Sequence, residues 1–307
     1  MNTFRRPAPI IAVSALALLV LALVAAQDAG NTHLSIAEAL LLGVVEGLTE
    51  YLPVSSTGHL TVTQQLLGLT DTPASKDAAD AYAIAIQAGA IVAVLGIYRH
   101  RIANALMAVA GRGRDPVAGR RLLTAIIVGF IPAAIVGLLL DSTIKEHLFG
   151  LWPVIAAWIV GGIVILRWPD AAGQRGRALE MITVRDGLII GLVQVLALWP
   201  GVSRSLVVIL AALAVGLSIA AAVEFTFLLG LVTLGAATLY ETLDKGSVIV
   251  DQFGIGAPIV GFLAAFVSAA AAVVWMVEYV QRRGLAIFGW YRIAIGVIVA
   301  ILALTVL

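Results

Sequence analysis

The 307-residue chain contains no cysteine, and only 12% of its residues are charged. The absence of cysteine excludes disulfide bonds, thiolate catalysis and cysteine-ligated metal centres. The four histidines are scattered and show no zinc-binding spacing. Soluble domains carry about 25% charged residues, whereas this chain is 61% hydrophobic, with a mean hydropathy of +1.06. The composition therefore predicts an integral membrane protein with little soluble mass, and the net charge of +1 gives no indication of nucleic-acid binding.

Residues 1–30 combine two early arginines with an apolar run that ends in Val24-Ala25-Ala26. The run is long enough to span a bilayer, and its end resembles a signal-peptide cleavage site. We therefore expect residues 1–30 to be either an extra N-terminal transmembrane helix or a cleaved signal peptide. In both cases a single membrane-embedded domain follows over residues 31–307.

Eight further apolar segments follow, and two of them are interrupted midway. Six uninterrupted segments predict full spans at about 79–98, 119–141, 150–167, 220–242, 254–279 and 288–306. The interrupted segments, about 35–68 and 183–216, contain proline or glycine beside serine and charged residues. A broken helix is tolerated at membrane depth only where it lines a cavity. We therefore expect an all-α integral membrane fold with six spans and two re-entrant helical hairpins.

Arginine is concentrated in alternate connections, which fixes the expected topology. Four arginine groups are predicted to be cytoplasmic: Arg5 and Arg6; Arg99, Arg101, Arg112, Arg114, Arg120 and Arg121; Arg167, Arg175, Arg177 and Arg185; Arg282 and Arg283. The opposite connections hold one lysine each. Six spans with two returning hairpins satisfy this bias throughout, whereas a hairpin that crossed fully would reverse the later connections.

An internal repeat at an offset of 148 residues relates the two hairpins. Residues 34–46 align with 182–194, and both copies begin with a helix-capping pattern. Three spans separate the copies, so the second copy is inverted relative to the first. We expect pseudo-repeats of about 34–167 and 182–307 whose hairpin tips meet near the bilayer midplane, as in other inverted-repeat membrane proteins.

The first hairpin carries a polar cluster inside an apolar surrounding. Glu46 and Glu50 are four residues apart and share one helix face. Pro53 is expected to end that helix and Ser55 to cap the next one, with His59 in its first turns. Ionisable residues at membrane depth indicate a functional site. The two carboxylates could instead only pair with a buried arginine and lock the hairpins together.

That arginine is Arg204, the only one that we place within the hydrocarbon region. Its guanidinium fork suits phosphate oxygens, and the Pro200-Gly201 turn before it leads into a helix N-terminus, which favours anions. Two carboxylates facing a phosphate would repel it unless a divalent cation lay between them. The pattern therefore predicts Mg²⁺ or Ca²⁺ bound by Glu46 and Glu50.

The segments Glu46-Gly-Leu-Thr-Glu-Tyr-Leu-Pro-Val-Ser-Ser-Thr-Gly-His59 and Leu198-Trp-Pro-Gly-Val-Ser-Arg-Ser205 resemble the two signature motifs of the undecaprenyl-diphosphatase family. These bacterial membrane enzymes recycle the cell-wall lipid carrier and confer bacitracin resistance. The likeness covers about residues 34–307. It implies hydrolysis of a polyprenyl diphosphate lipid to the monophosphate in the cytoplasmic membrane, at a site open to the periplasmic or extracellular face.

Matching positions give the residues that the resemblance implies for each role. Glu46 and Glu50 are the acidic pair for metal binding and catalysis, Ser56 is the nucleophile, and His59 is its acid-base partner. The substrate phosphates are assigned to Ser55, Ser203, Arg204 and Ser205.

The chain departs from the family pattern at Val208, where a threonine is usual. This departure motivates one alternative, a protein that binds polyprenyl diphosphate without hydrolysing it. A second alternative is a lipid-phosphate flippase, because inverted repeats around a midplane site suit alternating access.

Overall fold

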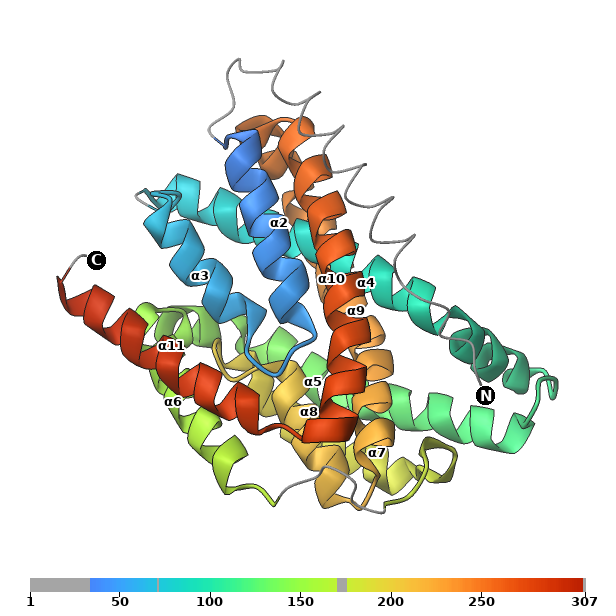
Figure 1. Cartoon of the computed structure of the whole chain (residues 1–307). Coiled ribbons are helices and arrows are strands. Elements are labelled where there is room, and N and C mark those ends of the chain that lie inside the picture. Colours follow the sequence, from blue (N-terminus) through green and yellow to red (C-terminus); the bar gives the residue numbers. More distant parts are fainter. Residues whose placement is uncertain (1–33, 71, 170–175, 306–307) are drawn as a thin grey trace.

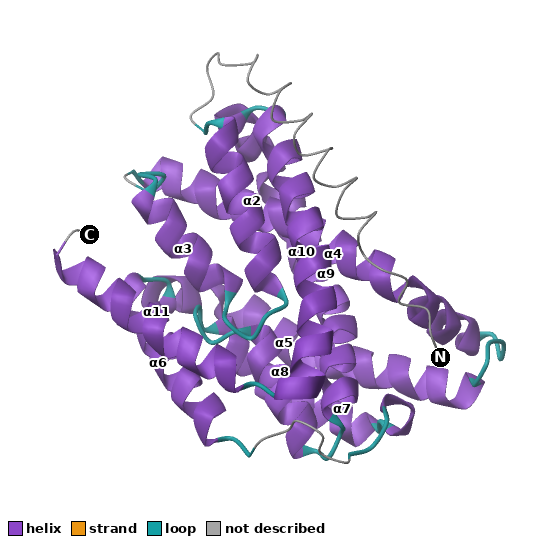
Figure 2. Ribbon diagram, in the orientation of Figure 1, coloured by secondary structure: helices purple, strands orange, loops and turns teal. Residues whose placement is uncertain are grey.

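The computed structural model describes residues 34–305 except residue 71 and residues 170–175, and this part of the chain contains helices and loops but no strand (Figures 1 and 2). The predicted all-α fold is confirmed. The N-terminal segment 1–30 lies outside the described residues. The helices are α2 (Ile36–Glu50), α3 (Ser56–Leu66), α4 (Pro73–Val109), α5 (Pro116–Leu148), α6 (Leu151–Arg167), η1 (Leu179–Met181), α7 (Val184–Gln194), η2 (Val195–Leu198), α8 (Arg204–Ala214), α9 (Ile219–Phe253), α10 (Gly256–Arg283) and α11 (Ala286–Thr305).

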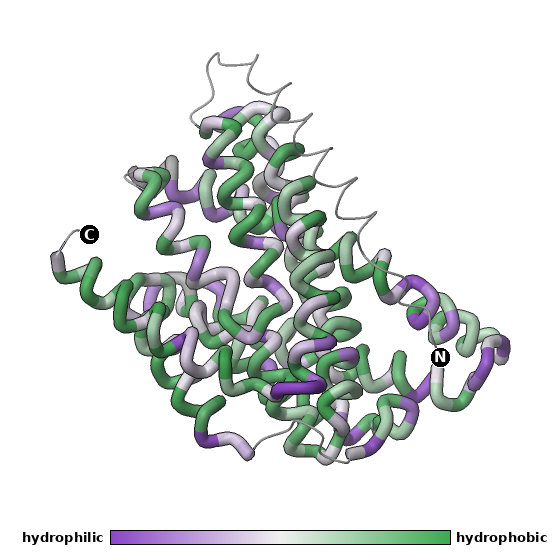
Figure 3. Tube along the Cα trace, in the orientation of Figure 1, coloured by the Kyte–Doolittle hydropathy of each residue, from purple (hydrophilic) through white to green (hydrophobic). Residues whose placement is uncertain are grey.

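Each predicted span corresponds to one helix, although several helices are longer than predicted. Among the described residues, α4, α5, α9, α10 and α11 are long and apolar enough to cross a membrane, and α6 is a shorter apolar helix of 17 residues. The longest, α4, has 37 residues. Helices exceed the predicted spans because hydropathy indicates only the part of a helix that matches the hydrocarbon thickness. The start of a helix is set by capping residues such as Asp115 and Ser218. Hydrophilic residues accordingly gather where α4 and α5 are connected (Figure 3).

Both hairpins break at equivalent residues. Among the described residues, Ser55 (φ 72°) and Ser203 (φ 75°) are the only non-glycine residues with positive φ, and they are 148 positions apart. Each is the N-cap of the helix that follows, α3 or α8. The helix-capping pattern predicted at the start of each copy is also formed, as a capping box at Ser35 and another at Thr183. The internal repeat is therefore visible in the backbone, while the re-entrant path through the membrane stays a prediction.

The two repeats also pack in the same way. Helix α2 lies against α10, and its repeat partner α7 lies against α5. A Cβ atom at Gly43 would lie 2.3 Å from the Gly261 carbonyl oxygen, and one at the equivalent Gly191 would lie 2.4 Å from the Gly129 oxygen. Small residues thus let the backbones approach closely, as is common between membrane helices. These contacts fix the direction in which each hairpin points.

Replacing Gly43 by alanine is expected to destabilise the protein, because the new methyl group would collide with rigid backbone on α10. Overpacking of this kind costs about 1–3 kcal/mol. Thermal unfolding in detergent would measure the loss. Gly96→Ala is the matched control: it is also helical, but its Cβ would meet nothing within 4 Å. Equal unfolding temperatures for the two variants would contradict the prediction.

Candidate functional site between the hairpin tips

A polar cavity of about 190 Å³ lies where the two hairpin breaks meet. Its walls come from both breaks and from α4, α5 and α9. The polar residues that line it are Glu50, Ser55, Ser56, Thr57, Gln87, Gln194, Ser203, Arg204 and Thr233. The predicted meeting of the two tips is therefore observed.

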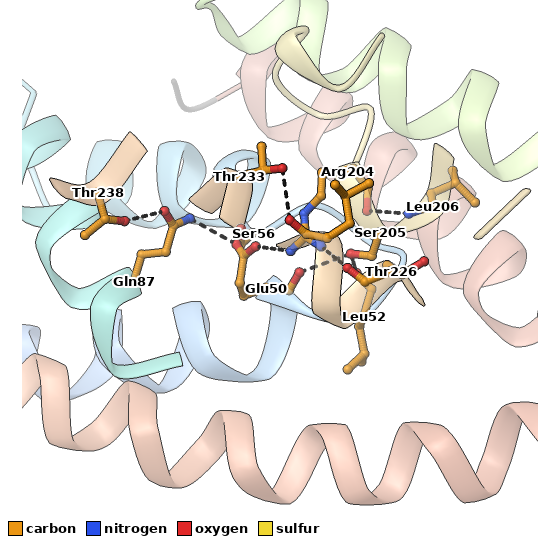
Figure 4. A network of polar contacts seen from close by, with 12 residues as sticks. Glu50, Leu52, Ser56, Gln87, Arg204, Ser205, Leu206, Thr226, Thr233 and Thr238 are labelled. Atoms are coloured by element: carbon orange, nitrogen blue, oxygen red, sulfur yellow. Dashed lines mark hydrogen bonds and ion pairs between the residues drawn. The ribbon is translucent and has the colours of Figure 1, made fainter. Parts of the chain in front are cut away.

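Glu50 connects the two tips through its carboxylate. Ser56 donates a hydrogen bond of 2.5 Å from Oγ to Oε2, and Arg204 donates from Nη2 to Oε1 at 3.0 Å (Figure 4). The amide of Gln87 adds a weaker contact to Oε2 at 3.3 Å and accepts from Thr238. The Glu50 side chain is 5% exposed and that of Arg204 9%, so this ion pair is shielded from water. The carboxylate thus holds a serine hydroxyl and an arginine side by side.

Arg204 is fixed on its other side by the backbone of α9. Its Nη1 donates to the Thr226 carbonyl at 2.9 Å, and its guanidinium lies 5.6 Å from the centre of the Tyr51 ring. Gly230 makes room for it, because a Cβ there would lie 2.3 Å from Nη1. Nε is buried and has no hydrogen-bond partner among the described residues. The two hydrogen bonds to Thr226 and Glu50 therefore leave part of the guanidinium's five N–H donors, including Nε–H, without a protein partner in the described part of the chain.

Two helix N-termini converge on the same cavity. The hydroxyl of Ser55 accepts from Gly58 N at 3.4 Å at the start of α3, and that of Ser203 accepts from Leu206 N at 3.3 Å at the start of α8. The other first-turn N–H groups have no partner within the helix, and the helix dipole is positive there. Two such ends and a guanidinium around one cavity make its electrostatics favourable for an anion.

Ser205, which the resemblance assigned to the substrate phosphates, lies behind the cavity wall. It is 1% exposed and does not line the cavity. Its hydroxyl contacts the carbonyls of Glu50 at 3.1 Å and Leu52 at 3.3 Å. It therefore joins the second tip to the first.

His59 does not reach Ser56 in the structure. Its Nδ1 lies 2.7 Å from the Ser55 carbonyl oxygen and its Nε2 lies 2.7 Å from the Tyr291 hydroxyl. A carbonyl oxygen only accepts, so Nδ1 carries a proton, and Nε2 of the neutral ring accepts from Tyr291. The imidazole packs against Trp158 with ring centres 4.9 Å apart. This contact with α6 turns it away from Ser56, whose hydroxyl instead bonds to Glu50.

Glu46 lies deeper than Glu50. It is 1% exposed and does not line the cavity. Its Oε1 has no hydrogen-bond partner among the described residues.

The two carboxylates fit a divalent cation in the chemistry of their oxygens, and the unpartnered Oε1 is a free ligand atom. No group of three or more acidic or histidine side chains in the described part of the chain could hold a metal. Mg²⁺ is often bound by one or two carboxylates together with substrate phosphates and water. A cation held by Glu46 and Glu50 would therefore need its remaining ligands from the substrate and solvent.

Several residues at the tips were missed by sequence reasoning. Sequence reasoning did not single out Arg292, which lies in α11 and is completely buried. Its position inside a predicted span was the available signal. Gln194 was also detectable, as the repeat counterpart of Glu46, whereas nothing local marked Gln87. Val208 is fully buried and does not line the cavity, so this departure removes no cavity-lining group.

The fold and the site define a multi-pass helical membrane protein with a polar cavity, lined by Glu50 and Arg204, between two structural repeats. The chain belongs to the family described as bacitracin resistance protein BacA, which matches residues 39–298. It is 43% identical over 270 residues to an undecaprenyl-diphosphatase of Sorangium cellulosum, covering 85% of this chain and 84% of the relative. It is 44% identical over 264 residues to undecaprenyl-diphosphatase 1 of Chromobacterium violaceum, covering 85% and 94% of the two chains. The family suggested by the two motifs is therefore confirmed.

Proposed function

We propose that this protein is a membrane phosphatase that hydrolyses undecaprenyl diphosphate to undecaprenyl phosphate and inorganic phosphate. The observation that carries the proposal is the contact chain from Ser56 through Glu50 to Arg204 at the polar cavity. The names of the curated relatives support the same reaction. The product would return to cell-wall synthesis as the lipid carrier.

In the proposed mechanism Glu50 is the general base for Ser56, in place of His59. As the Ser56 hydroxyl attacks the terminal phosphorus, its proton passes to the carboxylate that it already contacts at 2.5 Å. The bond from that phosphorus to the bridging oxygen breaks, and the lipid monophosphate leaves with the electron pair. Water then hydrolyses the phosphoserine and releases inorganic phosphate.

The positive groups of the second tip would stabilise the charge on the transferred phosphoryl group. Arg204 and the N-termini of α3 and α8 are fixed before the substrate binds, and fixed donors of this kind lower the barrier to phosphoryl transfer. A divalent cation held by Glu46 and Glu50 would supply further positive charge to the phosphate oxygens.

An apolar cavity suits the prenyl chain of the substrate. It measures about 430 Å³ and is lined by residues of α6, α7, η2 and α8, including Ala157, Val160 and Leu210. Trp199 lines both this cavity and the polar one, so the two are adjacent. The diphosphate would lie at the hairpin tips and the first isoprene units beside Trp199.

We place the protein in the bacterial cytoplasmic membrane, with the site open to the periplasmic or extracellular side. The distribution of arginines supports this orientation, because the arginine-rich connection between α4 and α5 belongs on the cytoplasmic side.

The decisive test is phosphate release from undecaprenyl diphosphate by the purified protein in detergent. We expect release by the intact protein, its loss on addition of a chelator, and its recovery with Mg²⁺ or Ca²⁺. Glu46→Gln should lower both the activity and the response to the cation. If the chelator left phosphate release unchanged, the divalent cation would no longer be part of the proposed mechanism.

The same assay separates the alternatives. A flippase releases no phosphate in detergent, because its turnover needs two compartments. A binding protein also releases none, but it retains the lipid diphosphate uncleaved. No release by well-folded protein under any cation condition would overturn the proposed function.

A further inference from the structure

Arg292 of α11 is a buried arginine that the proposed mechanism does not use. Its side chain is 0% exposed, and its contacts are with backbone carbonyls. Nη1 donates to Pro53 at 3.3 Å, and Nη2 donates to Ala157 at 2.8 Å and to Gly201 at 2.9 Å. No carboxylate among the described residues pairs with it. Burying a guanidinium without a carboxylate partner is energetically costly. The three hydrogen bonds to backbone carbonyls offset part of that cost.

Two of these carbonyls are equivalent in the two repeats. Pro53 and Gly201 are 148 positions apart, and each lies in the non-helical break of its hairpin. Carbonyls in a break have lost their helical partners, and an unsatisfied carbonyl is costly in a hydrocarbon environment. One guanidinium therefore satisfies both breaks and connects the tips to each other.

The surrounding structure is shaped to admit this side chain. A Cβ at Gly161 of α6 would lie 2.3 Å from Nη2, so glycine is needed there. The third carbonyl, that of Ala157, is on the same helix and anchors the guanidinium to α6. A lysine ammonium is a single point charge and lacks the planar fork that reaches three separate carbonyls.

We propose that Arg292 is a positioning residue that sets the separation of the two hairpin breaks. It touches neither Ser56 nor Glu50 nor Arg204, but it fixes the two tips from which these residues project. The kinetic part of this inference rests on the proposed function, whereas its structural part does not.

The kinetic test compares Arg292→Lys and Arg292→Met with the intact protein in the phosphate-release assay. We expect kcat to fall by about 10²-fold, because small misplacements of reacting groups have effects of this size. KM should change by only a few fold, since Arg204 and both helix N-termini remain. Val299→Ala is the matched control: Val299 is also buried on α11, but its apolar side chain packs in the cluster around Trp158 and donates no hydrogen bond to either break. It should lower the unfolding temperature without lowering kcat comparably.

The structural test measures the distance between the tips directly. The chain has no cysteine, so a cysteine pair replacing Leu48 and Leu196 would accept spin labels without background labelling. These positions are equivalent in the two repeats and are 43% and 60% exposed. We expect Arg292→Met to broaden and shift the distance distribution, and Val299→Ala to leave it unchanged.

The two readouts make the inference falsifiable by separate routes. An unchanged distance distribution in Arg292→Met would overturn it, as would a kcat loss matched by Val299→Ala at equal stability. If the intact protein released no phosphate, the proposed function would fail, and the spin-label distances would still decide the role of Arg292.

Discussion

Glu50→Gln is expected to lower kcat for phosphate release by about 10³-fold or more. The carboxylate accepts the Ser56 hydrogen bond at 2.5 Å, and an amide cannot take the proton that the serine must lose. General-base groups contribute about 10²–10⁴-fold. The same substitution leaves Arg204 without its charged partner, and breaking a buried ion pair costs about 3–5 kcal/mol. Steady-state phosphate release and thermal unfolding, measured on the same preparation, would quantify both effects.

Glu180→Gln is the matched control for that prediction. Glu180 also pairs with an arginine, Arg101 at 2.6 Å, but its side chain is 49% exposed and lies outside the polar cavity. Exposed pairs contribute about 0–1 kcal/mol, so activity and stability should barely change. A Glu50→Gln variant within about 10-fold of the intact protein would show that Glu50 is not the base. A larger loss in His59→Gln would then restore the acid-base role predicted from the sequence.

Arg204→Lys is expected to lower kcat by about 10²–10³-fold, the usual effect of losing one transition-state donor. Lysine keeps the charge but not the fork that contacts Glu50 and the Thr226 carbonyl at once. The space beside Gly230 would also be left unfilled. We expect KM for the lipid diphosphate to rise as well, because the anion site loses its fixed donor.

Arg101→Lys is the control for the arginine prediction. Arg101 pairs with Glu180 and Glu224 at 2.6 and 2.8 Å and does not line the polar cavity. Its replacement should leave kcat within a few fold. Equal activity in Arg204→Lys and Arg101→Lys would mean that a positive charge at position 204 is sufficient, contrary to the role proposed for the guanidinium.

The sequence predicted the parts of the fold that depend on local signals. The spans follow from apolar length, and the two breaks follow from Pro53 and the Pro200-Gly201 turn, with a capping serine after each. The internal repeat at an offset of 148 residues then predicted that the tips meet, with Arg204 within reach of the acidic pair. The observed Arg204–Glu50 distance of 3.0 Å agrees with that expectation.

The remaining features depend on which distant helix each side chain faces. His59 follows Ser56 by one turn, but its packing against Trp158 of α6 decides where the imidazole points. Gln87 reaches Glu50 only because α4 packs beside the first hairpin. Such choices arise from contacts between segments far apart in the chain, and spacing alone does not record them.

Neither repeat contains a complete site. The first supplies the carboxylate and the hydroxyl at positions 50 and 56, where the second has Leu198 and Arg204. Two identical halves could not reproduce this pairing of unlike groups, so each repeat depends on the other for the site. The effect of a substitution at Ser56 in the first half can therefore be interpreted only together with the guanidinium that the second half provides.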